Sequence, residues 1–187
     1  MEVFVDRLEA QWRQRRLAPE SVSIAPESTG GDNRPLVFLS HANQAQDVAM
    51  AGRIYDALTQ HAVPVFFDKV ELEKQPGTPW DSCLKKGIVR CAFFVAVISR
   101  NALSGEPGRY LHLEWQLANE RWFGSLRKRP FIVPVVLDDT KASEPEFDSL
   151  EGFREAQWTP LSDVTAIEEF AVRVKQLVRD LQTGASD

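Results

Sequence analysis

The chain has 187 residues, enough for one compact domain and a short appendage. Hydrophobic residues make up 43%, charged residues 26%, and the formal net charge is -5, which argues against nucleic acid as a direct partner because phosphate-binding domains are usually basic. The only two cysteines, Cys83 and Cys91, form no Cys/His cluster that would suit zinc, so we expect no metal site. The longest apolar run, at 92–98, is too short to span a membrane. The low cysteine content is typical of a reducing compartment, so we expect a cytoplasmic protein.

The first 34 residues differ in pattern from the rest. Residues 3–17 have apolar side chains at helical spacing, which predicts one amphipathic helix. Residues 18–34 contain two prolines, paired glycines and several small polar residues, which is typical of a linker. We therefore expect a helix and linker over 1–34 and a compact domain over 35–183.

Strands and helices alternate through the second part. The predicted strands are short apolar runs at 36–39, 63–67, 92–98, 131–137 and 157–161. Apolar stripes predict helices over 44–60, 80–90 and 109–123, and a last helix that starts near Thr165, where Thr165 and Glu168 could form a capping box. This alternation predicts an α/β fold with a five-stranded parallel sheet flanked by helices, while 138–155 has no clear pattern.

Two of these strands carry information about their place in the sheet. The run at 92–98 is apolar throughout, which predicts cover on both faces. Pro160 lies in the last run and has no N–H to give to a neighbour, which favours an edge position for 157–161.

Ligands of parallel α/β sheets bind beyond the carboxyl ends of the strands. The residues at these positions are Ser40, His41, Asp68, Ser99 and Asp138. No GxGxxG, Walker-type or GxSxG motif is present. The first strand also lacks the acidic cluster that a phospho-acceptor receiver needs for its magnesium.

Four segments, in this order, resemble the Toll/interleukin-1 receptor (TIR) family. They are PLVFLSHA at 35–42, VFFDKVELEKQPGTPW at 65–80, AFFVAVISRNALSGEPGRYLHLEWQLA at 92–118 and FIVPVVLDD at 131–139. The resemblance covers most of 35–139 and implies a flavodoxin-like TIR fold, with the amino-terminal helix outside it.

The resemblance implies two possible functions. One is assembly through TIR–TIR contacts, as a non-catalytic adaptor or a decoy of host signalling. The other, in bacterial-type members, is cleavage of the nicotinamide–ribose bond of NAD, which serves as substrate and not as cofactor. The products would be nicotinamide and either ADP-ribose or a cyclic ADP-ribose, in antiphage defence or virulence. Such enzymes commonly become active on self-association, and a sensor or partner protein could trigger it.

The resemblance assigns the catalytic role to Glu114, with Tyr110 one helical turn earlier. Cleavage of an N-glycosidic bond passes through an oxocarbenium-like state, which a carboxylate beneath the ribose stabilises. Tyr110 and Glu114 are four residues apart and so share one helix face, where the ring could stack on nicotinamide or ribose. By spacing alone, Glu114 would be an ordinary carboxylate at the rim of a buried face.

The remaining candidates are substrate-binding residues. Trp80 could line the nicotinamide pocket or simply belong to the core. Asp68 could bind ribose or only end a strand, and Gly77 permits a turn that could control access to the pocket. His41 could stack on a base, while Ser40 and Ser99 lie at strand ends. A nucleoside-processing enzyme of similar fold, such as a deoxyribosyltransferase relative, is a third and more distant possibility.

Overall fold

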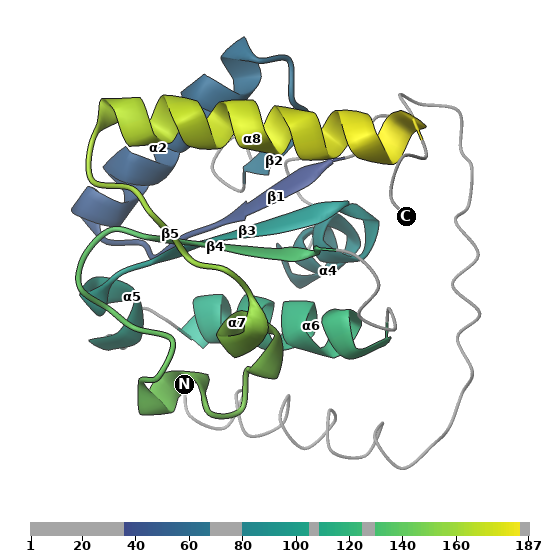
Figure 1. Cartoon of the computed structure of the whole chain (residues 1–187). Coiled ribbons are helices and arrows are strands. Elements are labelled where there is room, and N and C mark those ends of the chain that lie inside the picture. Colours follow the sequence, from purple (N-terminus) through teal and green to yellow (C-terminus); the bar gives the residue numbers. More distant parts are fainter. Residues whose placement is uncertain (1–35, 68–79, 105–108, 125–129, 184–187) are drawn as a thin grey trace. The chain divides into compact units, whose positions relative to one another are not determined.

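The computed structural model describes residues 36–67, 80–104, 109–124 and 130–183 (Figure 1). Contacts between Cα atoms divide the chain into two units, Met1–Asn33 and Arg34–Asp187, and every described residue belongs to the second. The helix predicted over 3–17 lies outside the described residues. None of the described helices is long and apolar enough to cross a membrane.

A five-stranded sheet forms the centre of this unit (Figure 1). Its strands are β1 (Val37–Ser40), β2 (Val65–Phe67), β3 (Phe93–Ile98), β4 (Ile132–Val136) and β5 (Thr159–Pro160). All neighbours are parallel, in the order β2-β1-β3-β4-β5, so the predicted fold class is confirmed. The two-residue β5 lies at the edge, as Pro160 indicated.

Helices cover both faces of the sheet. Figure 1 shows α2 (Ala45–Gln60) and α8 (Val164–Thr183) on one face. The helices α4 (Trp80–Arg90), α5 (Arg100–Ser104), α6 (Arg109–Gly124) and α7 (Glu151–Glu155) lie on the other. A 3-10 turn, η2 (Pro145–Phe147), precedes α7 in the stretch where the sequence had no clear pattern.

The buried side chains form one layer on each face of the sheet. In β1, Phe38 points into the layer beneath α4 and α6, while Val37 and Leu39 point into the layer beneath α2 and α8. The Phe38 ring stacks between Phe66 and Phe94, with centroids 4.9 and 5.3 Å away. All six residues of β3 are buried, which confirms the prediction for this strand.

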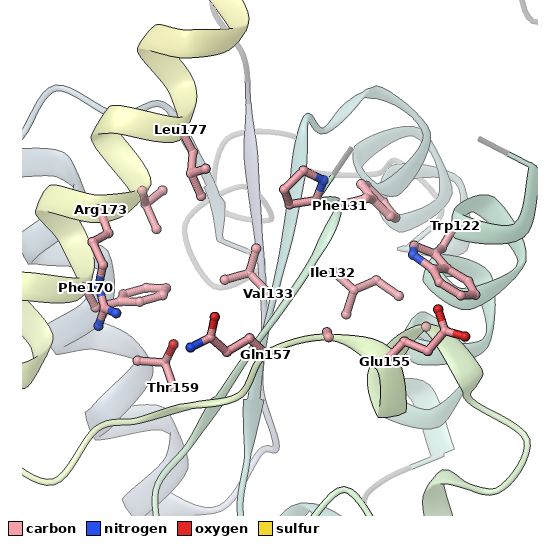
Figure 2. Close-up of a pocket in the computed structure, with 14 residues that line it drawn as sticks. Trp122, Phe131, Ile132, Val133, Glu155, Gln157, Thr159, Phe170, Arg173 and Leu177 are labelled. Carbon is pink, nitrogen blue, oxygen red and sulfur yellow. The ribbon is translucent and has the colours of Figure 1, made fainter. Parts of the chain in front are cut away.

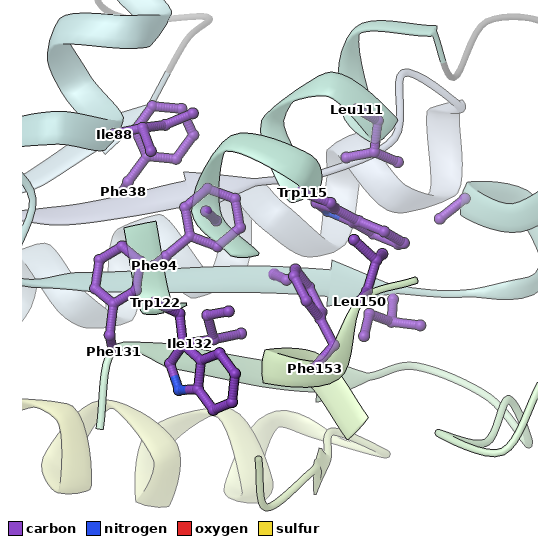
Figure 3. Packing of buried hydrophobic residues seen from close by; sticks show 14 of the residues in the cluster. Phe38, Ile88, Phe94, Leu111, Trp115, Trp122, Phe131, Ile132, Leu150 and Phe153 are labelled. Carbon is purple, nitrogen blue, oxygen red and sulfur yellow. The ribbon is translucent and has the colours of Figure 1, made fainter. Parts of the chain in front are cut away.

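Tight packing fixes α6 and α7 against each other and against the sheet. The Trp115 ring on α6 is fully buried and lies 5.7 Å from Phe147 and 5.3 Å from Phe153 (Figure 3). A Cβ atom on Gly152 would lie 2.8 Å from Ile132 and from Trp122. Glycine is therefore the residue that lets α7 approach β4 and α6 this closely.

One arginine joins α6 to the end of α4 and the start of β3. The Arg121 guanidinium donates hydrogen bonds to the carbonyl oxygens of Ile88 and Cys91, and it lies 4.3 Å from the centre of the Phe131 ring. The same guanidinium is near the Cys91 thiol. Burial nevertheless raises the pKa of Cys91 to about 11, because the cost of a buried thiolate exceeds the attraction of Arg121.

The first turn of α8 corrects one prediction. The helix begins at Val164, and a carboxylate oxygen of Asp163 accepts the N–H of Ala166 at 2.9 Å. Asp163 is therefore the N-cap, and the capping box expected at Thr165 and Glu168 is wrong. The hydrogen bonds from the Ala166 N–H and the Ser162 hydroxyl hold the pKa of Asp163 below its ordinary value. The carboxylate of Glu168 instead binds the His61 ring at 2.6 Å, which links α8 to the end of α2.

Candidate functional site

The structure joins two of the predicted site residues directly. The Ser40 hydroxyl donates a hydrogen bond of 2.6 Å to Oε2 of Glu114, across 74 residues of sequence. Ser40 is 1% exposed and Glu114 is 7% exposed. Glu114 is therefore a buried carboxylate with a hydroxyl donor, and not the rim residue that spacing alone would suggest.

The surrounding elements fix both partners of this hydrogen bond. Ser40 is the last residue of β1, a central strand, and it pairs with Ala96 of β3. Glu114 precedes Trp115, whose ring is locked into the core, so the rotation of α6 about its axis is set by packing. The carboxylate thus lies at the carboxyl end of β1, where parallel α/β sheets bind their ligands.

A second polar cluster lies at the end of β3. Asp47, in the first turn of α2, is fully buried. One of its oxygens accepts the Ser99 hydroxyl, and the other accepts the Asn101 amide at 3.1 Å. The Ser99 oxygen in turn accepts the N–H of Ala102 at 3.1 Å. The Ser99 hydroxyl thus holds α5 to α2 in the structure, whereas the sequence suggested that it binds substrate.

Sequence reasoning missed Asp47, although a signal was present. Asp47 lies four residues before Ala51 and seven before Ile54, so it falls on the apolar stripe of its own helix. A carboxylate on a core-facing stripe must find hydrogen-bond donors, because burial of an unpaired charge is very costly. That position could therefore have been identified as part of a polar cluster.

Asp138, at the end of β4, acts as a cap. Its carboxylate accepts the backbone N–H of Arg100 at 2.7 Å, together with the N–H and the hydroxyl of Thr140 at 3.0 and 2.6 Å. Partial burial would raise the pKa of Asp138, but these hydrogen bonds outweigh it and hold the pKa below its ordinary value. The Arg100 side chain contacts Asp139 and Glu144, and these acidic partners raise its pKa.

The other predicted residues differ in how far the structure places them. The His41 ring is partly exposed beside Ser40, and its centre lies 5.2 Å from that of the Phe67 ring. Asp68 and Gly77 lie outside the described residues.

For two aromatic candidates only the backbone is described. Trp80 opens α4, and Tyr110 is the second residue of α6, one turn before Glu114. The expected helical spacing between Tyr110 and Glu114 is therefore present, while the roles given to the two aromatic side chains stay predictions.

The described surface also has a groove, and Glu114 is not among the residues that line it (Figure 2). It has a volume of about 440 Å³ and runs beside the first half of β4, between α8 and the α6–α7 pair. None of the predicted site residues lines it. The lining residues are Trp122, Pro130, Phe131, Ile132, Val133, Gly152, Glu155, Ala156, Gln157, Thr159, Phe170, Arg173, Val174 and Leu177.

The chemistry available at the end of β1 follows from the buried Glu114 carboxylate. Glu114 is well placed to stabilise a developing positive charge, because an ionic interaction is stronger where water is largely excluded. Within the described ranges, no group of three or more His, Cys, Asp or Glu side chains could hold a metal ion.

Comparisons with known proteins agree with this architecture. A family model described as "TIR domain" matches residues 37–178. Among solved structures, the chain is similar to the TIR domains of the activated Roq1 resistosome, which directly recognises the pathogen effector XopQ. That match has a TM-score of 0.60 and 20% identity, and it covers 75% of this chain and 99% of the other. No curated protein gives a significant match.

Proposed function

Because the chain belongs to the TIR domain family, we propose that it is an NAD nucleosidase with Glu114 as its catalytic carboxylate. The observation that carries the proposal is the buried Glu114 carboxylate at the carboxyl end of β1, bonded to Ser40 at 2.6 Å. A glutamate that had only a solubilising role would lie in water, because an ionised side chain is costly to bury.

The proposed reaction breaks the bond between C1′ of the ribose and the nicotinamide nitrogen. The electron pair of that bond leaves with nicotinamide and neutralises its positive charge. Glu114 faces the ribose and stabilises the positive charge that develops on it. Water then attacks C1′ and loses a proton, which yields ADP-ribose; attack by a nucleophile within the substrate instead yields a cyclic ADP-ribose.

Nicotinamide is a good leaving group because it is already cationic in NAD. A separate general acid is therefore not required, and one carboxylate suffices. Tyr110, Trp80 and His41 are proposed to bind the nicotinamide ribose or the base, and Asp68 and Gly77 to shape the loop that follows β2.

The test is nicotinamide release from NAD by concentrated full-length protein, separated by chromatography, for the wild type and Glu114→Gln. The amide can still accept the Ser40 hydroxyl but carries no charge, so the variant is expected to fold and to lose at least about 100-fold in rate, as when one charge-stabilising group is removed. Glu120→Gln is the matched control, because it replaces the same side chain in the same way at an exposed position of the same helix. It is expected to keep wild-type activity.

Two results would count against the proposal. Nicotinamide release that is equal in Glu114→Gln and the wild type would remove Glu114 from the mechanism. No release by the wild type, even under conditions that promote assembly, would favour the non-catalytic interaction module. The similar structure is an activated resistosome, and by analogy we propose that TIR–TIR self-association is part of the function in either case.

A further inference from the structure

We infer that Ser40 is a positioning residue for Glu114, which rests on the proposed function of that carboxylate. The sequence suggested that Ser40 binds substrate. In the structure its hydroxyl hydrogen is directed to Oε2 of Glu114 at 2.6 Å. That distance lies in the range of charge-assisted O–H···O⁻ bonds, which are about twice as strong as neutral ones.

The burial of the pair gives this bond its importance. Ser40 is 1% exposed and Glu114 is 7% exposed, so little water reaches the carboxylate. A carboxylate with little hydration depends on protein donors to stay ionised. The Ser40 hydroxyl is such a donor, and it favours the ionised form that the proposed reaction needs.

The bond also restricts the orientation of the carboxylate. A glutamate side chain has three rotatable bonds, and the position of the helix backbone alone does not set them. Ser40 lies on a central strand, paired with Ala96 of β3, so its oxygen is a fixed point at the end of the sheet. The hydrogen bond to Oε2 restricts the positions that the carboxylate can take and lowers the entropic cost of ordering it during the reaction.

The decisive experiment measures Glu114 directly and needs no activity. Full-length protein labelled with ¹³C at the glutamate carboxyl carbon is titrated by NMR, and the Glu114 signal is assigned by its absence in Glu114→Gln. In Ser40→Ala the titration midpoint of Glu114 is expected to rise by about 1 pH unit, because the lost hydroxyl stabilised the ionised carboxylate more than the protonated carboxyl. Ser40→Thr retains a hydroxyl and is expected to return the midpoint toward the wild-type value.

Ser99→Ala is the matched control for this titration. It removes a buried hydroxyl from the residue that follows the neighbouring strand β3, but that hydroxyl binds Asp47 and not Glu114. The Glu114 midpoint is expected to stay within about 0.3 pH unit of the wild type, since a neutral group with no direct contact has little effect on ionisation. If Ser40→Ala does not fold, Ser40→Cys keeps the size of the side chain with a weaker donor and should shift the midpoint in the same direction.

A kinetic comparison separates positioning from general damage to the fold. Ser40→Ala is expected to lower kcat for nicotinamide release by about 10- to 100-fold with little change in KM. It is also expected to move the acidic limb of the pH–rate profile to higher pH. An unchanged Glu114 midpoint in folded Ser40→Ala overturns the positioning role, whatever the activity. A wild-type protein that releases no nicotinamide even under conditions that promote assembly overturns the proposed function instead, and the titration tells these two failures apart.

Discussion

Removal of the Asp47 carboxylate tests whether the second polar cluster holds the end of β3 in place. Asp47→Ala deletes two hydrogen bonds to a charged group, and it leaves the Ser99 hydroxyl and the Asn101 amide without their partner. Hydrogen bonds to charged groups contribute about 1.5–3 kcal/mol each. The mutation also removes the cost of burying a carboxylate, so we expect a net loss of about 3 kcal/mol in the free energy of unfolding.

Urea unfolding of the full-length protein, followed by tryptophan fluorescence, measures this loss. In thermal unfolding the same change corresponds to a decrease in Tm of roughly 6–12 °C for a domain of this size. Asp47→Asn should fall between the wild type and the alanine variant, because its amide keeps one acceptor and the Ser99 hydroxyl can turn to accept. Asp56→Ala, on the exposed side of the same helix, is the control and should change stability by less than about 0.5 kcal/mol. A loss below about 1 kcal/mol for Asp47→Ala would refute the reasoning.

Two further predictions concern packing and thiol chemistry. Gly152→Ala should lower the free energy of unfolding, measured in urea, by about 1–3 kcal/mol, because its Cβ would lie 2.8 Å from two neighbouring side chains. Gly52→Ala in α2 should instead raise the free energy of unfolding by about 0.5–1 kcal/mol, because its Cβ would meet no atom within 4 Å. Equal effects of the two substitutions would contradict the packing argument. In a Cys83→Ser background at pH 8, Cys91 should react with iodoacetamide at least about 100-fold more slowly in the folded protein than in urea, because burial raises its pKa to about 11; comparable rates would show that the thiol is accessible.

The sheet was predictable because its signals are local and repeated. The apolar run that became β3 and the proline that became part of β5 each indicate a position in the sheet, and the motif order placed Ser40 and Glu114 in one site. The short helices α5 and α7 were not predictable, because five residues show no helical period and their stability comes from distant contacts. These contacts include the cap from Asp138 to the N–H of Arg100 and the packing of Phe153 on α6.

The same limit applies to the candidate site. Sequence identified the residue types at strand ends, but not the partner that each side chain binds. Ser40 and Ser99 occupy equivalent places in the motif pattern, yet one donates to Glu114 and the other to Asp47. That difference depends on how α6 and α2 pack against the sheet, which periodicity does not specify.

The distance along the chain between Ser40 and Glu114 has a consequence for folding during synthesis on the ribosome. The two residues are 74 positions apart, so at 5–20 residues per second a ribosome adds Glu114 roughly 4–15 s after Ser40. Closing a loop of that length costs about 4 kcal/mol in chain entropy, which the pairing of β1 with β3 and the packing of α6 on the sheet together offset. A nascent or truncated chain that lacks α6 therefore has no buried carboxylate at this strand end. A protein proposed to cleave NAD would thus acquire its catalytic carboxylate only after β1, β2 and β3 have been synthesised.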